Sequence, residues 1–240
     1  MSNPSSPDQD PSETGSLLPE IIGWDVVNWS QALAFWSRRA RLPEAASCLE
    51  LGCGGNSSLS LWLAKRGDAV VCTDSGGVPE SIKASHRRHA VADRVTYADV
   101  DARAIPYKNR FDVIAFKSVL GGIVREAPAT VARQVMLSVH EALKPGGVLL
   151  FAENLTSTPL HHFARSRFMG RGSTWHYFAL GELREMLRPF QSFEMTTFGF
   201  LGCFGRSEPQ RRFLGKLDRS VFDKLVPAHW HYVAAAIAYK

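Results

Sequence analysis

Glycines and carboxylates in the first third of the chain have the spacing of a nucleotide-type binding corner. The stretch Ser47–Ala64 reads S-C-L-E-L-G-C-G-G-N-S-S-L-S-L-W-L-A, which is a short apolar run, a glycine-rich turn and the start of an amphipathic helix. Glycine permits a tight turn and lets the backbone approach a ligand closely. Asn56 or Ser57 would cap the helix by accepting hydrogen bonds from its first amides. A strand, a glycine turn and a helix N-terminus in this order predict a cofactor site.

Alternating strands and helices must position this corner. We expect strands over 48–51, 69–73, 95–97, 112–116 and 148–152, with helices over 56–66, 79–89 and 128–143 between them. Strands that are apolar throughout are typical of a parallel sheet covered on both faces. A helix at 180–187, a strand at 193–198, a helix at 211–225 and a last strand before Lys240 indicate an antiparallel pair. The predicted fold is α/β and doubly wound, with a mainly parallel seven-stranded sheet and an antiparallel C-terminal edge strand.

The chain divides into three expected parts. Residues 1–16 are almost all Pro, Ser, Gly or acidic, so they read as a disordered leader. Residues 17–46 carry apolar residues at helical spacing and predict an N-terminal helical cap. Residues 47–240 form the remaining domain, in which 155–178 lacks clean periodicity and reads as a substrate-side insert.

Composition bounds the class of protein. The formal net charge is +5, but the basic clusters are scattered along the chain, so solvated surface is the favoured interpretation and nucleic acid the weaker one. The four cysteines show no zinc spacing, so we expect reduced thiols, no metal and a cytoplasmic protein. No apolar run approaches the ~20 residues that a membrane-spanning helix needs, so no membrane partner is expected.

Five motifs in order carry a resemblance to a known family. They are L-E-L-G-C-G-G, V-V-C-T-D, A-D-V-D-A-R-A-I-P-Y, F-D-V-I-A-F and L-K-P-G-G-V-L-L-F, over roughly Ser47–Glu153. In order and spacing the chain resembles the class I S-adenosylmethionine-dependent methyltransferases, which implies their Rossmann-like fold and S-adenosyl-L-methionine as cofactor. A nicotinamide-binding loop would instead read G-x-G-x-x-G, and Ser57 takes the place of its last glycine.

The resemblance implies a cofactor-binding set. Glu50 would hold the methionine amino group, unless it is a strand-end carboxylate paired with a cation. Asp74 would accept from both ribose hydroxyls, unless it is only a turn or cap residue. Asp101 would accept from the adenine amino group beside the Ala102 amide, with Asp99 competing for that role. The other expected contacts are Gly52, Cys53, Gly54, Asn56 and Ser75 around the loop, and Lys117 and Ser118 at the methyl-donor end.

Methyl transfer needs little covalent help, but a general base assists if the acceptor starts protonated. The candidates are His161, His162, His176 and Glu153, although buried or surface histidines without a catalytic role are common. Trp175, Tyr177 and Phe178 would wall an aromatic acceptor pocket or simply pack in the core.

The expected function is methyl transfer to O or N of a small molecule, such as a secondary metabolite, by a monomer or homodimer. The N/D/S-P-P-Y/F/W tetrapeptide of methylation on nucleobase or amide nitrogens is absent, and F-K-S-V stands in its place. The alternatives are an RNA or protein methyltransferase and a non-catalytic binding protein on the same fold. The sequence leaves the acceptor unidentified.

Overall fold

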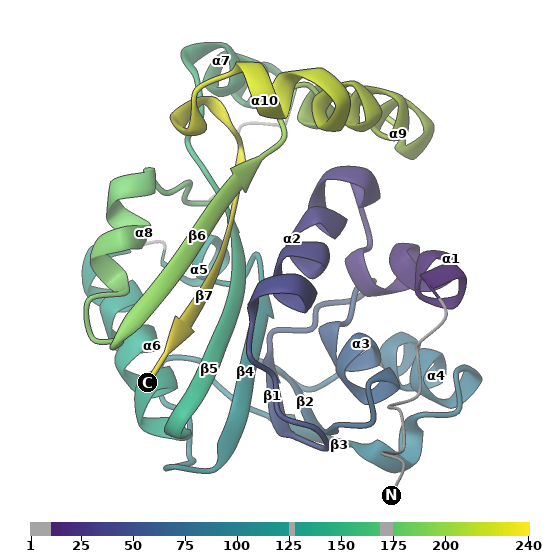
Figure 1. Cartoon of the computed structure of the whole chain (residues 1–240), viewed down its shortest axis with the longest axis vertical. Coiled ribbons are helices and arrows are strands. Elements are labelled where there is room, and N and C mark those ends of the chain that lie inside the picture. The colour runs from purple at the N-terminus through teal and green to yellow at the C-terminus, as the bar shows by residue number, and fades with distance from the viewer. Residues whose placement is uncertain (1–10, 125–127, 169–174) are drawn as a thin grey trace, which may run out of the picture.

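The computed structural model describes residues 11–124, 128–168 and 175–240. Its described part centres on a seven-stranded sheet in the order β3-β2-β1-β4-β5-β7-β6 (Figure 1). The first five strands pair in parallel, whereas β7 is antiparallel to both β5 and β6. The predicted α/β fold is confirmed. The last strand in the sequence, β7, lies between β5 and β6, so β6 rather than the C-terminal strand forms this edge of the sheet.

The elements have the following bounds. The strands are β1 (Ser47–Leu51), β2 (Ala69–Asp74), β3 (Val95–Asp99), β4 (Phe111–Lys117), β5 (Leu143–Asn154), β6 (Ser192–Phe198) and β7 (Val233–Tyr239). The helices are α1 (Pro11–Ile22), α2 (Val26–Arg39), α3 (Leu59–Lys65), α4 (Glu80–Arg88), α5 (Leu120–Ile123), α6 (Pro128–Ala142), α7 (Pro159–Phe168), α8 (Leu180–Met186), α9 (Glu208–Leu217) and α10 (Asp223–Leu225). Short turns η1 (Ala92–Arg94), η2 (Gly202–Phe204), η3 (Asp218–Phe222) and η4 (Ala228–Trp230) connect them.

The sheet separates two apolar cores because side chains alternate between its faces along each strand. On one face, strand residues such as Cys48, Val113 and Leu150 pack against α1–α4. On the other, Leu49, Ile114 and Phe151 pack against α5, α6 and α8. Both faces are covered, which explains why the parallel strands read as continuous apolar runs.

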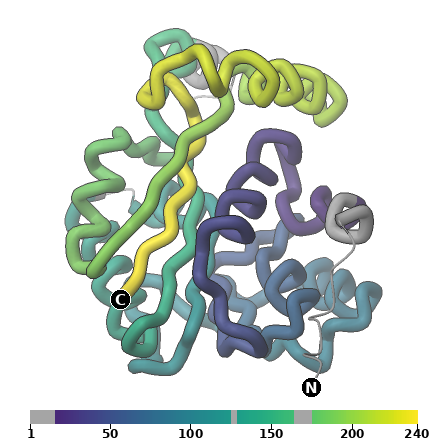
Figure 2. The backbone as a smooth tube through the Cα atoms, in the orientation of Figure 1, coloured from purple at the N-terminus to yellow at the C-terminus, as the bar shows by residue number. Residues whose placement is uncertain are grey.

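The carboxyl ends of the parallel strands meet at one edge of the sheet. The segment that connects β6 to β7 arches beyond this edge with α9 and α10, and α7 lies at the same end (Figure 2). Helix α2 reaches the edge from the side and is tied to the sheet by a 3.1 Å hydrogen bond from Trp36 Nε1 to the Ala236 carbonyl. This edge is where ligands of open α/β sheets bind.

Some boundaries differ from the sequence-based expectation. Helix α1 begins at Pro11 and so includes the last residues of the predicted leader, whose residues 1–10 lie outside the described part. The segment predicted as one helix over 211–225 is α9, a π-helical turn and α10. The division into leader, cap and domain stays a prediction. None of the helices in the described ranges is long and apolar enough to cross a bilayer.

Candidate functional site

The glycine turn follows β1 at the carboxyl edge. Gly52 and Gly54 have positive φ angles of 64° and 65°, which favour glycine over residues with a Cβ. The Gly54 amide donates to Asp74 Oδ2 at 2.8 Å, and the Cys53 amide donates to the Thr73 carbonyl at 2.9 Å. The turn is therefore fixed to the end of β2. A Cβ on Gly54 or Gly55 would meet nothing within 4 Å, so the turn borders open space.

Glu50 is bonded to the start of α3, and its predicted contact with the methionine amino group stays a prediction. Its side chain is buried, and its carboxylate accepts from the amides of Leu59 at 2.6 Å and Ser60 at 2.9 Å. It also accepts from Ser58 Oγ at 3.1 Å. Burial raises the pKa of Glu50, against the opposing effect of these hydrogen bonds. Both carboxylate oxygens accept hydrogen bonds at the start of α3, so a methionine amino group would have to share them.

The predicted cap of α3 is wrong for the same reason. The helix begins at Leu59 rather than at Asn56 or Ser57, and its N-cap residue Ser58 makes no side-chain cap. Glu50 takes over this role from the preceding strand. Asn56 is left exposed beside the turn, where a contact to the cofactor stays a prediction.

The ends of β2 and β3 present further acids at the same edge. Asp74 is half-buried, and within the described part of the chain its Oδ1 has no hydrogen-bond partner. Asp99 accepts from the Gly76 amide at 3.0 Å, next to the exposed Ser75. Asp74 and Asp99 thus each present a second carboxylate oxygen that could accept from a ribose, and Asp74 is the one bonded to the glycine turn.

Asp101 follows β3 and is held by a neighbour. Its carboxylate pairs with the Arg103 guanidinium, at 2.6 Å for the shortest contact. Hydrogen bonding from Arg103 lowers the pKa of Asp101. Ala102 is buried beside it. Because Arg103 already occupies both oxygens, an adenine amino group would have to share or displace this pair.

Lys117 and Ser118 end β4, as expected for the methyl-donor end. The Lys117 ammonium lies 5.0 Å from the centre of the Trp29 ring of α2. Burial lowers the pKa of Lys117 to about 8, although Glu153 and Glu50 favour its charged form. Ser118 has a positive φ of 54°, and its Oγ accepts from Asn154 Nδ2 at 3.1 Å. The structure therefore places a cation under α2 at this edge.

Glu153 and His176 each form hydrogen bonds with α5 or its N-cap. Glu153 Oε1 accepts from the Val119 and Leu120 amides at 2.7 Å each, which caps α5. The His176 amide donates to the Gly121 carbonyl at 2.9 Å. Burial raises the pKa of Glu153 to about 7. Three buried polar atoms here have no partner among the described residues: Glu153 Oε2, Trp175 Nε1 and His176 Nε2.

The structure does not bring the other two histidines into this cluster. His161 is fully buried, with Nδ1 2.6 Å from Thr158 Oγ1 and Nε2 2.7 Å from the Phe200 carbonyl oxygen. Because both ring nitrogens are occupied, His161 is a structural residue here. His162 is exposed on the next position of α7. Among the predicted bases, Glu153 and His176 are the two that bond to the α5 segment, Glu153 through its carboxylate and His176 through its amide.

Sequence reasoning missed the glycine pair in α5. A Cβ on Gly121 would lie 2.2 Å from Trp175 Nε1 and 2.5 Å from the His176 carbonyl oxygen. The pair therefore lets residues 175–176 pack directly on α5. Its signal in the sequence is the G-G dipeptide just after a strand, in S-V-L-G-G-I.

The glycine turn supplies the first testable expectation. A Cβ on Gly52 would lie 2.7 Å from Val119 Cγ2, whereas Gly54 has the same φ but open space. Positive φ costs a residue with a Cβ about 1–2 kcal/mol at either site, and Gly52→Ala adds the clash. In denaturant unfolding, we expect Gly52→Ala to lose more stability than Gly54→Ala. Val119→Ala in the Gly52→Ala background should recover part of the difference, and equal losses in the two single variants would refute the clash.

Comparisons with known proteins identify a known domain in part of the chain. Residues 49–151 match the model of a methyltransferase domain. A search of the curated proteins found no match. Solved structures share the fold over most of the chain at low sequence identity.

Three of these structures are representative. Phosphoethanolamine N-methyltransferase 2 of Haemonchus contortus, with phosphomonomethylethanolamine and S-adenosylhomocysteine, has a TM-score of 0.60 at 18% identity, covering 88% of this chain and 52% of that one. The [4+2]-cyclase SpnF has 0.57 at 18% identity, covering 88% and 79%. The YcgJ protein of Bacillus subtilis has 0.59 at 12% identity, covering 88% and 98%. The chain spans about half the length of the Haemonchus enzyme.

The domain match covers the glycine turn, Asp74, Asp101 and β4, which are the segments that the sequence motifs singled out. The solved relatives include a form of the Haemonchus enzyme with S-adenosyl-L-methionine bound. Residues 49–151 therefore match a methyltransferase domain, which supports over this range the resemblance to the class I S-adenosylmethionine-dependent methyltransferases that the sequence motifs carry.

Proposed function

We propose that the chain transfers a methyl group from S-adenosylmethionine to an oxygen or nitrogen of a small molecule. One observation carries the choice of acceptor: Glu153 Oε2, Trp175 Nε1 and His176 Nε2 are buried without partners around α5. A buried polar group without a partner costs about 1–3 kcal/mol, so a bound acceptor that pairs with these atoms gains that energy. A small molecule reaches buried atoms more readily than a folded polymer does.

The residues at the carboxyl edge fit the cofactor. Gly54, Gly55, Gly76 and Gly77 border space in which a Cβ would meet nothing within 4 Å. Asp74, at the end of β2, would accept from the ribose hydroxyls through Oδ1, while its Oδ2 holds the Gly54 amide. When bound, S-adenosylmethionine supplies an electrophilic methyl group on a sulfonium for in-line displacement.

The chain's own contribution is to orient the acceptor and to take its proton. Two amides fix Glu153 Oε1, which leaves Oε2 to hold the acceptor's hydroxyl or amine. With a pKa of about 7, Glu153 can accept a proton near neutral pH. Trp175 Nε1 would donate a hydrogen bond to the acceptor and so fix its orientation toward the methyl group. Orientation contributes more to the rate of methyl transfer than proton removal does. Lys117 is a cation at the same end of β4 that holds an anionic group of the bound molecules.

The pH dependence of methyl transfer tests these roles. We expect the rate to rise as pH passes about 7, where Glu153 loses its proton, and to fall above about 8, where Lys117 loses its charge. Glu153→Gln keeps an oxygen for the Val119 and Leu120 amides but cannot accept a proton. It should lower the rate about 10²–10⁴-fold and remove the acidic limb. Lys117→Met should remove the alkaline limb.

The measurement is release of S-adenosylhomocysteine with panels of phenols, carboxylic acids and amines, beside RNA and protein substrates. Calorimetry with S-adenosylmethionine accompanies it, and Glu153→Gln should bind the cofactor as the natural chain does. Turnover with RNA or protein alone would overturn the small-molecule proposal. Absence of cofactor binding would overturn methyl transfer altogether, an outcome that matters because SpnF, of the same fold, is a cyclase.

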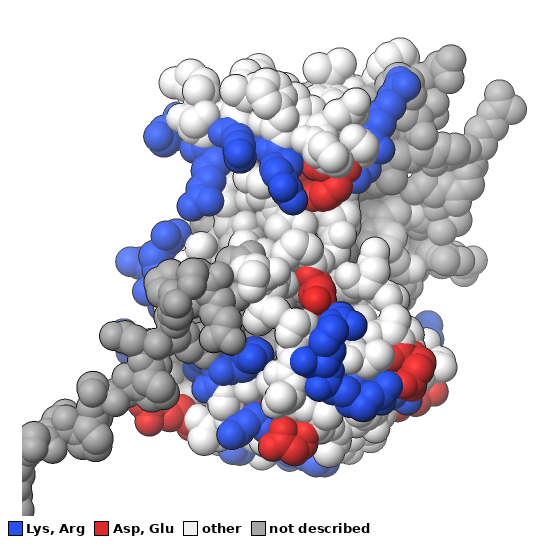
Figure 3. Space-filling model, turned by 90° about the vertical axis from the view of Figure 1, so that its right-hand side faces the viewer, with Lys and Arg blue, Asp and Glu red and all other residues white. Residues whose placement is uncertain are grey.

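A polymer acceptor finds less support on the surface. On the face in Figure 3, Lys and Arg side chains form separate groups with acidic residues among them, rather than one continuous positive band. Arg211 lies over the Trp24 ring at 5.2 Å and 3.7 Å from Glu208, so part of its charge is matched. Arg165, Arg167 and Arg171, the other cations considered for such a band, lie outside the residues whose side chains are described.

A further inference from the structure

The segment from α9 to η4 exposes large apolar side chains at the end of the molecule beyond the carboxyl edge. Phe213 is 64% exposed, Leu225 77%, Val221 41% and Trp230 42%. On α7, which lies at the same end, Leu160 is 57% exposed (Figure 1). Isolated exposed apolar residues need no explanation, but several within one short segment mark an interaction surface. We call residues 209–230 the outer segment.

Cations flank these apolar residues, and the acids of the same stretch face inward. The exposed cations of the outer segment are Arg212, Lys216, Arg219 and Lys224. Its acids are Asp218 and Asp223. The exposed charges of the outer segment are therefore positive, and Figure 3 shows cations around this end with uncharged residues above them.

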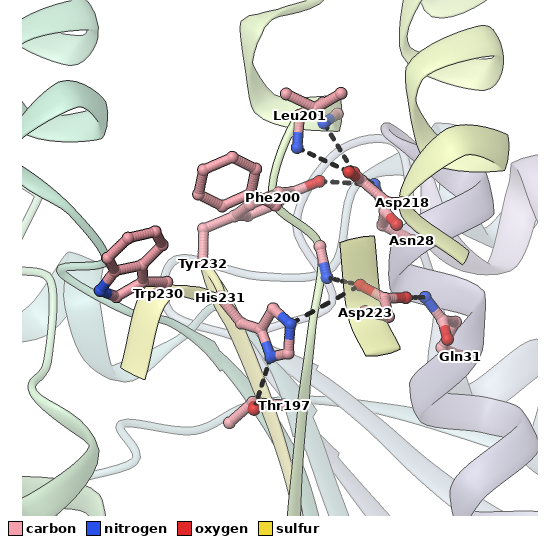
Figure 4. Close-up of polar contacts among 12 residues, drawn as sticks. Asn28, Gln31, Thr197, Phe200, Leu201, Asp218, Asp223, Trp230, His231 and Tyr232 are labelled. Atoms are coloured by element: carbon pink, nitrogen blue, oxygen red, sulfur yellow. Dashed lines mark hydrogen bonds and ion pairs between the residues drawn. The ribbon is translucent and has the colours of Figure 1, made fainter. Parts of the chain in front are cut away.

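The inward acids make this face rigid. Asp218 accepts from the Leu201 amide at 2.7 Å and from Asn28 Nδ2 at 3.0 Å. Asp223 accepts from the Gly199 amide at 2.7 Å and from Gln31 Nε2 at 2.8 Å (Figure 4). These bonds join the outer segment to α2 and to the turn after β6. The exposed apolar residues of the outer segment therefore belong to a segment that is anchored to the rest of the fold by hydrogen bonds.

Ring contacts also anchor this segment. Phe200 stacks on Phe222 at 5.6 Å and on Trp230 at 6.2 Å between ring centres. His161 of α7 contacts Phe200 at 5.1 Å, which joins α7 to the same rings. Val221 and Leu225 lie close to Phe222 in the chain, and both are exposed.

We propose that the outer segment docks the protein on the surface of an anionic lipid bilayer. Basic residues that flank apolar tips are the pattern of proteins that lie in a membrane interface. A second copy of the chain is a poorer occupant, because a two-fold contact would bring like charges together. Nucleic acid is also a poorer occupant: Phe213 and Trp230 could stack on bases, but the aliphatic Val221 and Leu225 beside them offer no ring and fit lipid better. The expectation of no membrane partner rested on the lack of a spanning segment, which surface docking does not require.

Vesicle co-sedimentation with the full chain tests the proposal. We expect binding to mixed phosphatidylcholine–phosphatidylserine vesicles, weak binding to phosphatidylcholine alone, and a decrease with salt. Each cation near an anionic surface contributes about fivefold, so Arg219→Glu with Lys224→Glu should weaken binding at least tenfold. Phe213→Ser with Leu225→Ser should weaken it comparably, because both side chains are more than half exposed and their loss leaves the fold intact.

Matched controls lie on other faces of the molecule. Arg184→Glu on α8 and Leu137→Ser on α6, where Leu137 is 44% exposed, should bind vesicles as the natural chain does. The proposal fails if the natural chain does not bind anionic vesicles, or if the controls lose binding as much as the outer-segment variants. It also fails if Leu225→Ser converts a dimer to a monomer, since a second copy then covers this face. Thermal unfolding of each variant verifies that it is folded.

Discussion

Glu50→Ala is expected to lower the stability of the protein by about 2–4 kcal/mol, because buried donors lose their acceptor. The Leu59 and Ser60 amides at the start of α3 donate to this carboxylate, and no other acceptor replaces it. For a chain of this size such a loss lowers the melting temperature by roughly 4–16 °C. Urea unfolding should show a lower midpoint with an unchanged slope.

The control for this expectation is Glu44→Ala, which removes the same charge from an exposed position and should change stability little. Glu50→Gln adds a sharper comparison. The amide keeps the shape of the side chain but presents a donor to a group of donors, so it should be destabilising as well. If Glu50→Ala unfolded like the natural chain but no longer bound S-adenosylmethionine, the result would contradict the structural role and support the methionine-binding role predicted from sequence.

The polar network around Glu50 shows what the sequence could not reveal. His86 of α4 lies 3.2 Å from the hydroxyls of both Ser58 and Ser60, and its other ring nitrogen lies 3.0 Å from Tyr97 Oη. Burial lowers the pKa of His86 to about 4, so the ring is neutral and can accept from a serine. These residues come from four elements. Local rules for helix caps consider neighbours within three residues, so they favoured Asn56 or Ser57.

The fold was predictable because its signals are local and repeated. Apolar runs such as V-V-C and V-I-A-F, each followed by a helix, suffice to predict a parallel sheet with helices on both faces. The position of β7 between β5 and β6 was not predictable. It depends on the path of the segment that connects β6 to β7, which no local pattern specifies. Helix α2 fixes one face of β7 through the hydrogen bond from Trp36 Nε1 to the Ala236 carbonyl, while Ala234, Ala236 and Ala238 pack in the core on the other face.

The positions of Asp74 and the glycine turn were predictable from motifs, and the contacts around α5 were not. Asp74 and the glycine turn lie where their spacing indicated, at the ends of adjacent strands. Trp175 and Gly121 are far apart in the sequence, and their contact depends on the absence of a Cβ. His161 looked like a candidate base in the sequence, but the structure uses both of its nitrogens. Residue type alone cannot distinguish an occupied from an unoccupied imidazole.

Asp74→Ala is expected to weaken binding of S-adenosylhomocysteine about 10–100-fold. A hydrogen bond to a charged group contributes about 1.5–3 kcal/mol, and each 1.4 kcal/mol corresponds to about a tenfold change in affinity. Adenosine should lose affinity by the same factor as S-adenosylhomocysteine if Asp74 holds the ribose, because the two ligands share it. Calorimetry with both ligands measures this ratio. Asp93→Asn removes the same charge from an exposed turn and should leave both affinities unchanged.

Asp74→Ala also removes the acceptor of the Gly54 amide and so loosens the glycine turn. A second variant is therefore needed to separate this effect from the loss of a ribose contact. Asp74→Asn keeps an oxygen that can accept from this amide while removing the charge that favours the ribose hydroxyls. We therefore expect Asp74→Asn to melt like the natural chain without ligand, yet to show a much smaller rise in melting temperature with S-adenosylhomocysteine. A full ligand-induced rise in Asp74→Asn would show that the carboxylate serves the turn alone. In that case the ribose partner must be sought elsewhere at the carboxyl edge.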